Sequence, residues 1–128
     1  MPNERSSLTI LGSTVRSAVE HVECFPAPPG CTSVKFTTEE LSSLCPVTKQ
    51  PDISTAEIYY EPNELCVESK SLKLFLWSFR DAEIFAETLA AEIAGEILTI
   101  AAAQLVRVTV TQRPRGGIQL QTISELTS

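Results

Sequence analysis

The period of the hydrophobic positions changes near the middle of the chain. From Ser69 onward, apolar residues follow the i, i+3, i+4, i+7 spacing of a buried helical stripe, namely Leu72, Phe75, Leu76 and Phe79. Glu68 and Ser69 stand where the N-cap of such a helix is expected. The pattern predicts a first helix over about residues 69–80, with the opposite face formed by Lys70, Lys73, Trp77 and Arg80.

A second and longer helical pattern follows, from about Asp81 to Ala103. One side of this helix carries its apolar residues, which are Ala86, Leu89, Ala90, Ile93, Ile97 and Ile100. Its acidic residues lie away from that side: Glu83, Glu87, Glu92 and Glu96. Gly95 lowers the helix propensity locally. The sequence therefore predicts a pair of helices, one directly after the other.

Segments of alternating polar and apolar residues lie on both sides of the helical pair. Residues 20–25 ("EHVECF") and 32–38 ("TSVKFTT") predict a hairpin across the loop "PAPPGC". Residues 54–62 alternate again and predict a further strand or an extended arm. After the helices, residues 104–113 and 116–124 predict two strands joined by the turn "PRGG".

Together these elements predict an α+β protein with an antiparallel four-stranded sheet and a pair of antiparallel helices on one face. The expected order of the elements is ββααββ. A small sheet with one open face and open edges favours assembly, so we expect a homo-oligomer. The first eight or so residues and the final "SELTS" are polar, and we expect both ends to be loose.

The composition fits one globular domain over residues 1–128, because the chain is 43% hydrophobic and 20% charged. No apolar stretch is long and uncharged enough to be a membrane span. The N-terminus, "MPNERSSLTILGS", lacks the basic and then apolar run of a secretory signal. We therefore expect a cytoplasmic protein without membrane partners.

The net charge of −6 argues against a protein whose whole surface binds nucleic acid. The basic residues are unevenly placed, with Lys70, Lys73 and Arg80 in one segment and Arg107, Arg113 and Arg115 in another. Such clusters suit a local anion site, for example a clamp for cofactor phosphates. The ordinary alternative for the lysine segment is a solvated helix face, and composition alone leaves both open.

The four cysteines are too few and too irregularly spaced for a disulfide scaffold, and no CxxC pair suggests a zinc site. His21 is the only histidine of the chain. A metal site or catalytic triad that needs histidine would therefore have to use that one residue.

The stretch "LSSLCPVTKQPD", residues 41–52, places Cys45 in a loop with two prolines and a carboxylate seven positions further on. Three roles for Cys45 stay open: an inert buried thiol, a metal ligand, or a nucleophile with Asp52 as its proton partner. Lys49 lies within a turn or two, where its charge would favour the thiolate.

Glu87 stands in "IFAE", beside an apolar cluster near the start of the second predicted helix. The helix dipole favours a glutamate there, so capping or a surface position is the ordinary interpretation. A functional carboxylate would instead accept two N–H donors from a planar base.

Four motifs, in this order, carry a resemblance to a known family: "SLCPVTKQPD", "VESKSLKLFLWSFR", "FAE" and "PRGG". From about Thr37 to Ile118, the chain resembles the NADPH-dependent 7-cyano-7-deazaguanine reductases of queuosine biosynthesis in their short, single-module form. That family has the tunnelling fold (T-fold) of the relatives of GTP cyclohydrolase I. The resemblance implies two-strand, two-helix, two-strand units that form rings, with active sites between subunits.

The resemblance also implies a reaction. Cys45 matches the family's nucleophile, which attacks the nitrile carbon to give a covalent thioimidate, and Asp52 matches the acid that protonates the nitrile-derived nitrogen. Two hydrides from two NADPH would then give the primary amine, 7-aminomethyl-7-deazaguanine. The implied substrate is a small molecule, with no direct contact to nucleic acid.

Further matches imply binding roles. The positions associated with NADPH are Lys70, Ser71 and Lys73 and, beside the Gly-Gly turn, Arg113 and Arg115. The positions that contact substrate are Glu68, Ser69, Phe85, Ala86 and Glu87. Among these, the resemblance implies that Glu87 anchors the guanine-like edge of the base through two hydrogen bonds.

Ala86 departs from the family pattern, because the family has histidine where this chain has alanine in "FAE". That histidine is thought to help close the pocket and assist proton transfer, and general acid assistance is worth roughly 10²–10⁴-fold. An amidine-forming relative that adds ammonia and a deazapurine-binding module without catalysis therefore stay open. The lysine motif disfavours the first, and the scarcity of histidine disfavours a zinc cyclohydrolase on the same fold.

Overall fold

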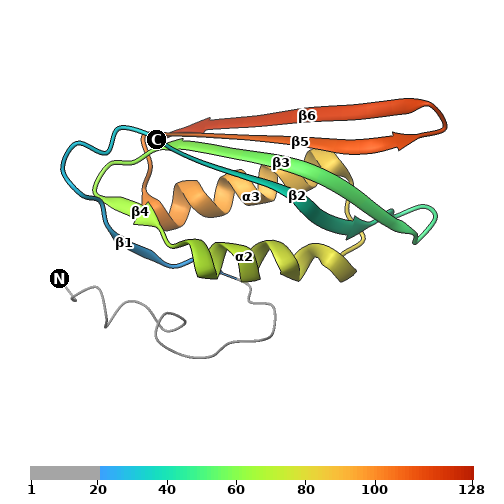
Figure 1. Ribbon diagram of the computed structural model, residues 1–128, viewed down its shortest axis with the longest axis horizontal. Coiled ribbons are helices and arrows are strands. Elements are labelled where there is room, and N and C mark those ends of the chain that lie inside the picture. The colour runs from blue at the N-terminus through green and yellow to red at the C-terminus, as the bar shows by residue number, and fades with distance from the viewer. Residues whose placement is uncertain (1–20) are drawn as a thin grey trace.

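Residues 21–128 are described by a computed structural model, and the expectations for residues 1–20 lie outside this range (Figure 1). The elements, in chain order, are β1 (Cys24–Pro26), β2 (Val34–Leu44), β3 (Pro51–Glu61), β4 (Leu65–Val67), α2 (Ser69–Trp77), the 3₁₀ turn η1 (Ser78–Asp81), α3 (Ala86–Ala101), β5 (Leu105–Arg115) and β6 (Ile118–Thr127). None of the described helices is long and apolar enough to cross a membrane.

Four long strands form one antiparallel sheet in the order β2-β3-β5-β6, and α2 and α3 cover one of its faces (Figure 1). The helices run antiparallel, since α2 begins beside β4 and α3 returns to that end. α2 lies against β2, whereas α3 lies against β5 and β6. The predicted α+β class, four-stranded antiparallel sheet and helical pair on one face are confirmed.

The core fills the space between this sheet and the helices. Buried residues of β3 and β5 are spaced two apart, and they are Ala56, Ile58, Tyr60, Val106, Val108 and Val110. Fully buried residues of α3 are spaced three or four apart, and they include Leu89, Ile93 and Ile97. The strand period of two and the helix period of 3.6 thus direct the apolar faces of both layers toward each other.

The predicted hairpin between residues 20–25 and 32–38 is wrong. β1 pairs with β4 in a separate two-stranded sheet, and β2 pairs with β3. The connecting loop is rich in proline, which has no N–H to give to a tight hairpin. The Ala27 N–H instead bonds the Glu64 carbonyl at 2.9 Å, which extends the β1–β4 pair. The segment expected to be a strand or an arm is β3, a central strand of the main sheet.

The second helix begins later than the sequence predicts. Residues 82–85 lie outside any helix, and α3 begins at Ala86. The Leu44 N–H bonds the Ala82 carbonyl at 2.8 Å, and the Ile84 N–H bonds the Leu44 carbonyl at 3.0 Å. These residues thus pair with the end of β2, and a helix in their place would leave the backbone groups of Leu44 without those partners.

The C-terminal end is more regular than the sequence predicts. The expectation that "SELTS" is loose is wrong, because β6 continues to Thr127, which pairs with Leu105. The predicted turn between the last two strands is confirmed. Gly116 and Gly117 have φ values of 59° and 78°, the positive values that a two-residue hairpin loop requires at both central positions.

Irregular pairing interrupts β2 and β5, and each interruption adds one residue to the strand. In β2 the register shifts between Thr38 and Leu41, after which Leu41 is buried on the helix-facing side. In β5 it shifts between Gln112 and Arg115, around Pro114, which has no N–H for the ladder. Because side chains alternate with a period of two, one extra residue turns the following side chains to the other face of the sheet.

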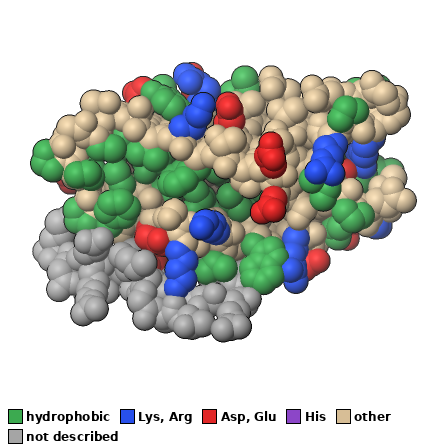
Figure 2. Space-filling view, viewed as in Figure 1, with side chains coloured by type: hydrophobic (Ala, Val, Ile, Leu, Met, Phe, Trp, Pro, Cys, Tyr) green, Lys and Arg blue, Asp and Glu red, His purple; other side chains and the backbone are tan. Residues whose placement is uncertain are grey.

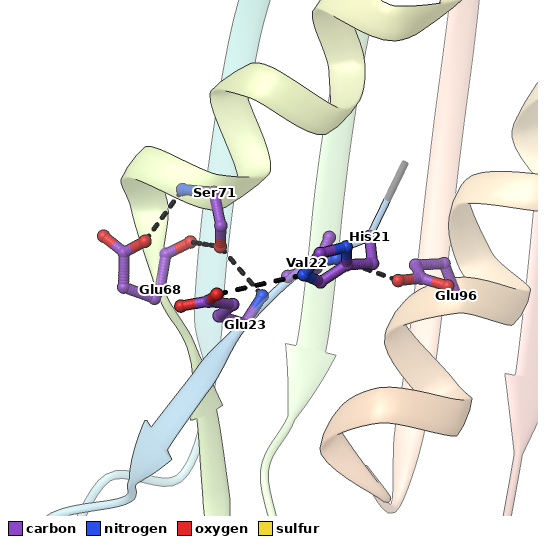
Figure 3. A network of polar contacts seen from close by, with 6 residues as sticks. All are labelled: His21, Val22, Glu23, Glu68, Ser71 and Glu96. Atoms are coloured by element: carbon purple, nitrogen blue, oxygen red, sulfur yellow. Dashed lines mark hydrogen bonds and ion pairs between the residues drawn. The ribbon is translucent and has the colours of Figure 1, made fainter. Parts of the chain in front are cut away.

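A polar network ties residues 21–23, just before β1, to both helices (Figure 3). The Glu23 N–H donates to the Ser71 hydroxyl of α2 at 2.9 Å, and the Val22 N–H donates to the Glu96 carboxylate of α3 at 2.9 Å. His21 Nε2 lies 3.8 Å from Glu23 Oε1. These contacts fix the segment that contains the only histidine across the start of α2 and the middle of α3.

Candidate active site

The connection between β2 and β3, residues 45–50, is a loop closed by its own backbone. The Cys45 N–H bonds the Gln50 carbonyl at 2.9 Å, and the Lys49 N–H bonds the Cys45 carbonyl at 2.9 Å. Lys49 takes the left-handed conformation, with φ of 62°, to close the loop. This geometry holds Cys45 just past the end of β2, with only 6% of the residue exposed.

Hydrogen-bond donors of the same loop converge on the Cys45 sulfur. The Thr48 side chain contributes most, followed by the backbone groups of Thr48 and Val47, and the Arg115 side chain adds a smaller effect. Burial opposes them. Together these contacts lower the pKa of Cys45 from 9.0 to about 7. A thiol with this pKa is partly thiolate at neutral pH, so the structure favours the nucleophile over the inert thiol.

Lys49 does not have the role that the sequence predicts. Its ammonium group contacts the Glu83 carboxylate and donates to the Pro46 carbonyl at 2.9 Å. Lys49 is also absent from the groups that lower the pKa of Cys45. The expected effect on the thiolate is therefore wrong, and Lys49 instead ties the cysteine loop to the segment that precedes α3.

Asp52 lies near the start of β3 on the helix-facing side of the sheet, and it is 4% exposed. Arg115 Nη1 is 2.7 Å from Asp52 Oδ1, an ion pair whose angles do not meet those of a hydrogen bond. Gln112 Nε2 donates to Asp52 Oδ2 at 3.3 Å. Arg115 also lowers the pKa of Cys45, by a smaller effect than Thr48, so one guanidinium acts on both predicted catalytic residues.

Two buried serines adjoin Asp52. Ser43 is paired with Asp52 across β2 and β3, and Ser54 follows two residues later on the same face. Each is 1% exposed, and neither hydroxyl has a hydrogen-bond partner among residues 21–128. An unpaired buried hydroxyl costs about 1–3 kcal/mol. A polar patch kept at this cost within an apolar layer is typical of a functional site.

The start of α3 presents its side chains in opposite directions. Phe85, the N-cap residue, is 55% exposed, and Glu87 is exposed in the first turn. Ala86 is 2% exposed and belongs to the core. Glu87 is therefore open to a ligand from outside this chain, whereas Ala86 faces inward.

Two polar side chains at the start of α2 form hydrogen bonds within the chain itself. Glu68 is the N-cap, as the sequence predicts, and its carboxylate accepts the N–H groups of Lys70 at 2.8 Å and Ser71 at 2.7 Å. The Ser71 hydroxyl donates to the Glu68 carbonyl at 2.9 Å, and Ser71 is fully buried. These two residues, expected to bind substrate and cofactor, thus stabilise the helix start.

A groove of about 390 Å³ lies between α2 and β2. Ser69, Lys73 and Trp77 line its helix side, while Leu41 lies on its strand side. The Arg80 guanidinium stacks over the Trp77 ring at 4.5 Å. Figure 2 shows basic side chains along this part of the molecule, on either side of a hydrophobic patch. Basic groups beside an apolar groove suit an anionic ligand with a flat ring.

The structure separates the predicted residues into two groups. α2 begins at the end of the molecule near β1 and β4, whereas the β2–β3 loop lies past the other end of α2 (Figure 1). Ser69 and Lys73 therefore lie away from Cys45 and Asp52 within one chain. The Arg113 side chain is exposed and makes neither a hydrogen bond nor an ion pair with the described residues.

Two features of the site escaped the sequence interpretation. Thr48 is three residues after Cys45, the spacing of one tight turn, and this spacing was a usable signal for a donor to the thiol. Arg115 was expected to contact the cofactor, and its contact with Asp52 depends on the irregular pairing in β5. No local pattern in the sequence indicates that pairing except Pro114.

The other thiols differ from Cys45. Burial raises the pKa of Cys24 to about 11, and burial also raises the pKa of Cys66. Within residues 21–128, no group of three or more His, Cys, Asp or Glu side chains is placed to hold a metal ion. Cys45, whose pKa is lowered, thus differs from Cys24 and Cys66, whose pKa values are raised.

Comparisons with known proteins agree with the resemblance. A family model described as "QueF-like protein" matches residues 51–128. A protein of Desulfovibrio desulfuricans named NADPH-dependent 7-cyano-7-deazaguanine reductase is 40% identical over 102 residues, which cover 80% of this chain and 60% of that protein. A protein of the same name from Rhizobium etli is 43% identical over 127 residues, with 94% of this chain and 82% of that protein covered.

The chain spans about 60% of the length of the first of these relatives. A solved structure, the archaeosine synthase QueF-Like in its apo form, aligns with a TM-score of 0.69 at 24% identity and covers 73% of this chain and 92% of that one. This likeness shows the fold, and the tunnelling fold predicted from the sequence is confirmed.

Proposed function

The chain belongs to the QueF-like protein family, and from this membership we propose that it reduces the nitrile of 7-cyano-7-deazaguanine to a primary amine with NADPH. The observation that carries the proposal is the arrangement around Arg115. A cysteine whose pKa is lowered to about 7 and a buried carboxylate share this one guanidinium, at the positions where the family has its nucleophile and acid.

The chain's own residues account for the first covalent step. The Cys45 thiolate forms a C–S bond to the nitrile carbon as one π bond of the nitrile breaks. The Asp52 carboxylate takes up the proton that Cys45 loses and passes it to the nitrile nitrogen, so the product is a neutral thioimidate. NADPH, when bound, supplies hydride, and a nitrile needs two hydrides to become an amine, with Cys45 expelled as thiolate between them.

Glu87 is proposed to select the base. Its exposed carboxylate, in the first turn of α3, offers two acceptor oxygens to the N–H pair of a guanine-like edge. Phe85, 55% exposed beside it, offers a ring face for stacking on the base. A planar, hydrogen-bonded purine edge is thus the ligand class that fits this helix start.

We propose that the active site is completed between copies of the chain. Within the part of the chain that the structure describes, both outer strands of the sheet, β2 and β6, have an unpaired edge, and each is long enough to add strands from another copy. The groove with Ser69 and Lys73 lies away from Cys45 within one chain, so a partner copy is needed to bring the two together. A homo-oligomer is the simplest assembly that satisfies both observations.

Lys73 and Lys70 are proposed to hold the cofactor phosphates at the groove between α2 and β2. Lys73 lines that groove, and Trp77 adds a flat apolar face. Lys73→Gln is expected to raise the KM for NADPH about tenfold, since a hydrogen bond to a charged group is worth about 1.5–3 kcal/mol. Lys35→Gln is the matched control, because Lys35 is an exposed lysine whose ammonium lies 3.7 Å from Glu57. An equal KM in both variants would remove Lys73 from the cofactor site.

The experiment that tests the function is intact-mass analysis of the protein mixed with 7-cyano-7-deazaguanine, with and without NADPH. We expect an adduct of the mass of the nitrile on Cys45 without NADPH, and its loss with formation of the amine when NADPH is added. Amidine as the product after addition of ammonia would point to the ammonia-adding class. An adduct that NADPH never discharges would indicate a catalytically impaired variant, and absence of any adduct would refute the proposal.

A further inference from the structure

Arg115 lies between the nucleophile and the acid of the proposed site. Its Nη1 atom is 2.7 Å from Asp52 Oδ1, and its guanidinium also contributes to the lowered pKa of Cys45. Asp52 is 4% exposed, whereas the Arg115 side chain is 49% exposed. The more exposed cation therefore lies on the solvent side of the buried carboxylate.

The backbone around Arg115 explains how it reaches this position. Gln112 lies on the buried face of β5, so strict alternation would turn Arg115 toward the opposite face. The register shift around Pro114 adds one residue, and Arg115 returns to the face that carries Asp52. Gly116, with φ of 59°, then starts the tight turn that ends the strand. The local structure thus aims this side chain.

We propose that Arg115 is a positioning residue for thioimidate formation, which holds the Asp52 carboxylate and the Cys45 sulfur in one arrangement, rather than a ligand for cofactor phosphates. This inference rests on the proposed function. Arg115, which the family resemblance places with NADPH, is thereby assigned to the first covalent step. That step then depends on a third residue in addition to the nucleophile and the acid.

The two roles for Arg115 differ in what happens without cofactor. If Arg115 positions Asp52, its loss leaves a buried carboxylate with only the 3.3 Å contact from Gln112, and the attack of Cys45 slows even when NADPH is absent. If Arg115 binds cofactor phosphates, its loss leaves the cofactor-free adduct rate unchanged and raises the KM for NADPH.

The test is the rate of adduct formation on Cys45 without NADPH, followed by intact mass between pH 5.5 and 9. Arg115→Gln is expected to slow this step about tenfold or more at pH 7, because it removes the charged partner of a buried carboxylate. Arg115→Lys keeps the charge but lacks the forked donor geometry, and its adduct rate is expected to lie between those of the wild type and Arg115→Gln. The KM for NADPH is expected to change less than twofold, roughly the effect of a surface substitution.

Arg107→Gln is the matched control. Arg107 lies on the same strand and pairs with Glu125 at 2.6 Å, but both side chains are about half exposed. An exposed pair of this kind is worth little, so the adduct rate is expected to stay at the wild-type value. Far-ultraviolet circular dichroism of each variant separates a lost contact from a lost fold, and Arg115→Lys supplies the answer if Arg115→Gln does not fold.

Two results would overturn the inference. One is an unchanged adduct rate in Arg115→Gln together with a raised KM for NADPH. The other is an unchanged pH midpoint for alkylation of Cys45 by iodoacetamide in Arg115→Gln. This second test needs no substrate, so it still applies if the wild-type protein forms no adduct, an outcome that would refute the proposed function itself.

Discussion

Replacement of Thr48 by valine tests the origin of the reactive thiol. The Thr48 side chain is the largest of the contacts that lower the pKa of Cys45 from 9.0 to about 7. At pH 7 a thiol of pKa 7 is about half thiolate, whereas a thiol of pKa 9 is about 1% thiolate. Nucleophilicity falls with pKa, with a Brønsted slope of about 0.4–0.5, so the lower pKa costs each thiolate about six- to tenfold in reactivity.

Because of these two effects, the curves of alkylation rate against pH are expected to cross for wild type and Thr48→Val. If the loss of the hydroxyl raises the pKa of Cys45 by about one pH unit, alkylation at pH 7 slows only about twofold, while the plateau above pH 10 rises about threefold. The pH midpoint is therefore a sharper observable than the rate at one pH. The sign is fixed by the chemistry, since the reactive species is the thiolate and a lower pKa keeps it present at lower pH.

The assay is iodoacetamide alkylation between pH 5.5 and 10.5, with the modified cysteine identified by peptide mass. Mapping is needed because the chain has three other cysteines, among them Cys24, whose pKa burial raises to about 11. Thr48→Ser, which keeps the hydroxyl, is the control and is expected to retain the midpoint near pH 7. A wild-type midpoint near 9, or the same midpoint in Thr48→Val and wild type, would refute the account of the thiol.

Three further predictions concern stability and are checked by urea unfolding. Ser54→Ala removes a buried hydroxyl that has no partner among the described residues, and it is expected to be neutral or to raise the free energy of unfolding by up to about 1 kcal/mol. Ser71→Ala removes a hydrogen-bonded hydroxyl and is expected to lower the free energy of unfolding by about 1–3 kcal/mol. Equal effects in the two variants would contradict this difference between bonded and unbonded hydroxyls. Ala86→His overpacks the core and is expected to cost about 1–3 kcal/mol, against less than about 0.5 kcal/mol for exposed Glu87→His; equal costs would mean that position 86 does not face the core. Gly117→Ala places a side chain at φ of 78° and is expected to cost about 1–2 kcal/mol, and a neutral result would contradict that backbone conformation.

The helices and the last two strands could be predicted from local pattern because each segment carries its own period. The stripe from Leu72 to Phe79 and the alternation of β5 persist in the structure, and Glu68 caps α2 as its position indicates. The pairing of the strands was harder to predict from the sequence. β1 pairs with β4, far along the chain, and no local feature of "EHVECF" distinguishes that partner from the nearer β2.

The candidate site divides in the same way. Motif resemblance pointed to Cys45 and Asp52, and the structure places both beside Arg115. Their roles remain predictions, as do those of Lys73 and Glu87. The expected effect of Lys49 on the thiolate was wrong because proximity in sequence does not give direction in space, and its ammonium contacts Glu83 of the segment before α3 instead.

The sequence by itself determined the fold class and the helical pair, since these depend on residue type and on periods of 2 and 3.6. Its motifs also supplied the candidate site residues. Only the tertiary structure decided which of those residues meet. A single added residue in β2 turns Leu41 and Ser43 to the helix-facing side and leads to Cys45, and another in β5 does the same for Arg115. A bulge reverses the alternation of every residue after it, and its position is set by pairing with a neighbouring strand, which no single segment contains.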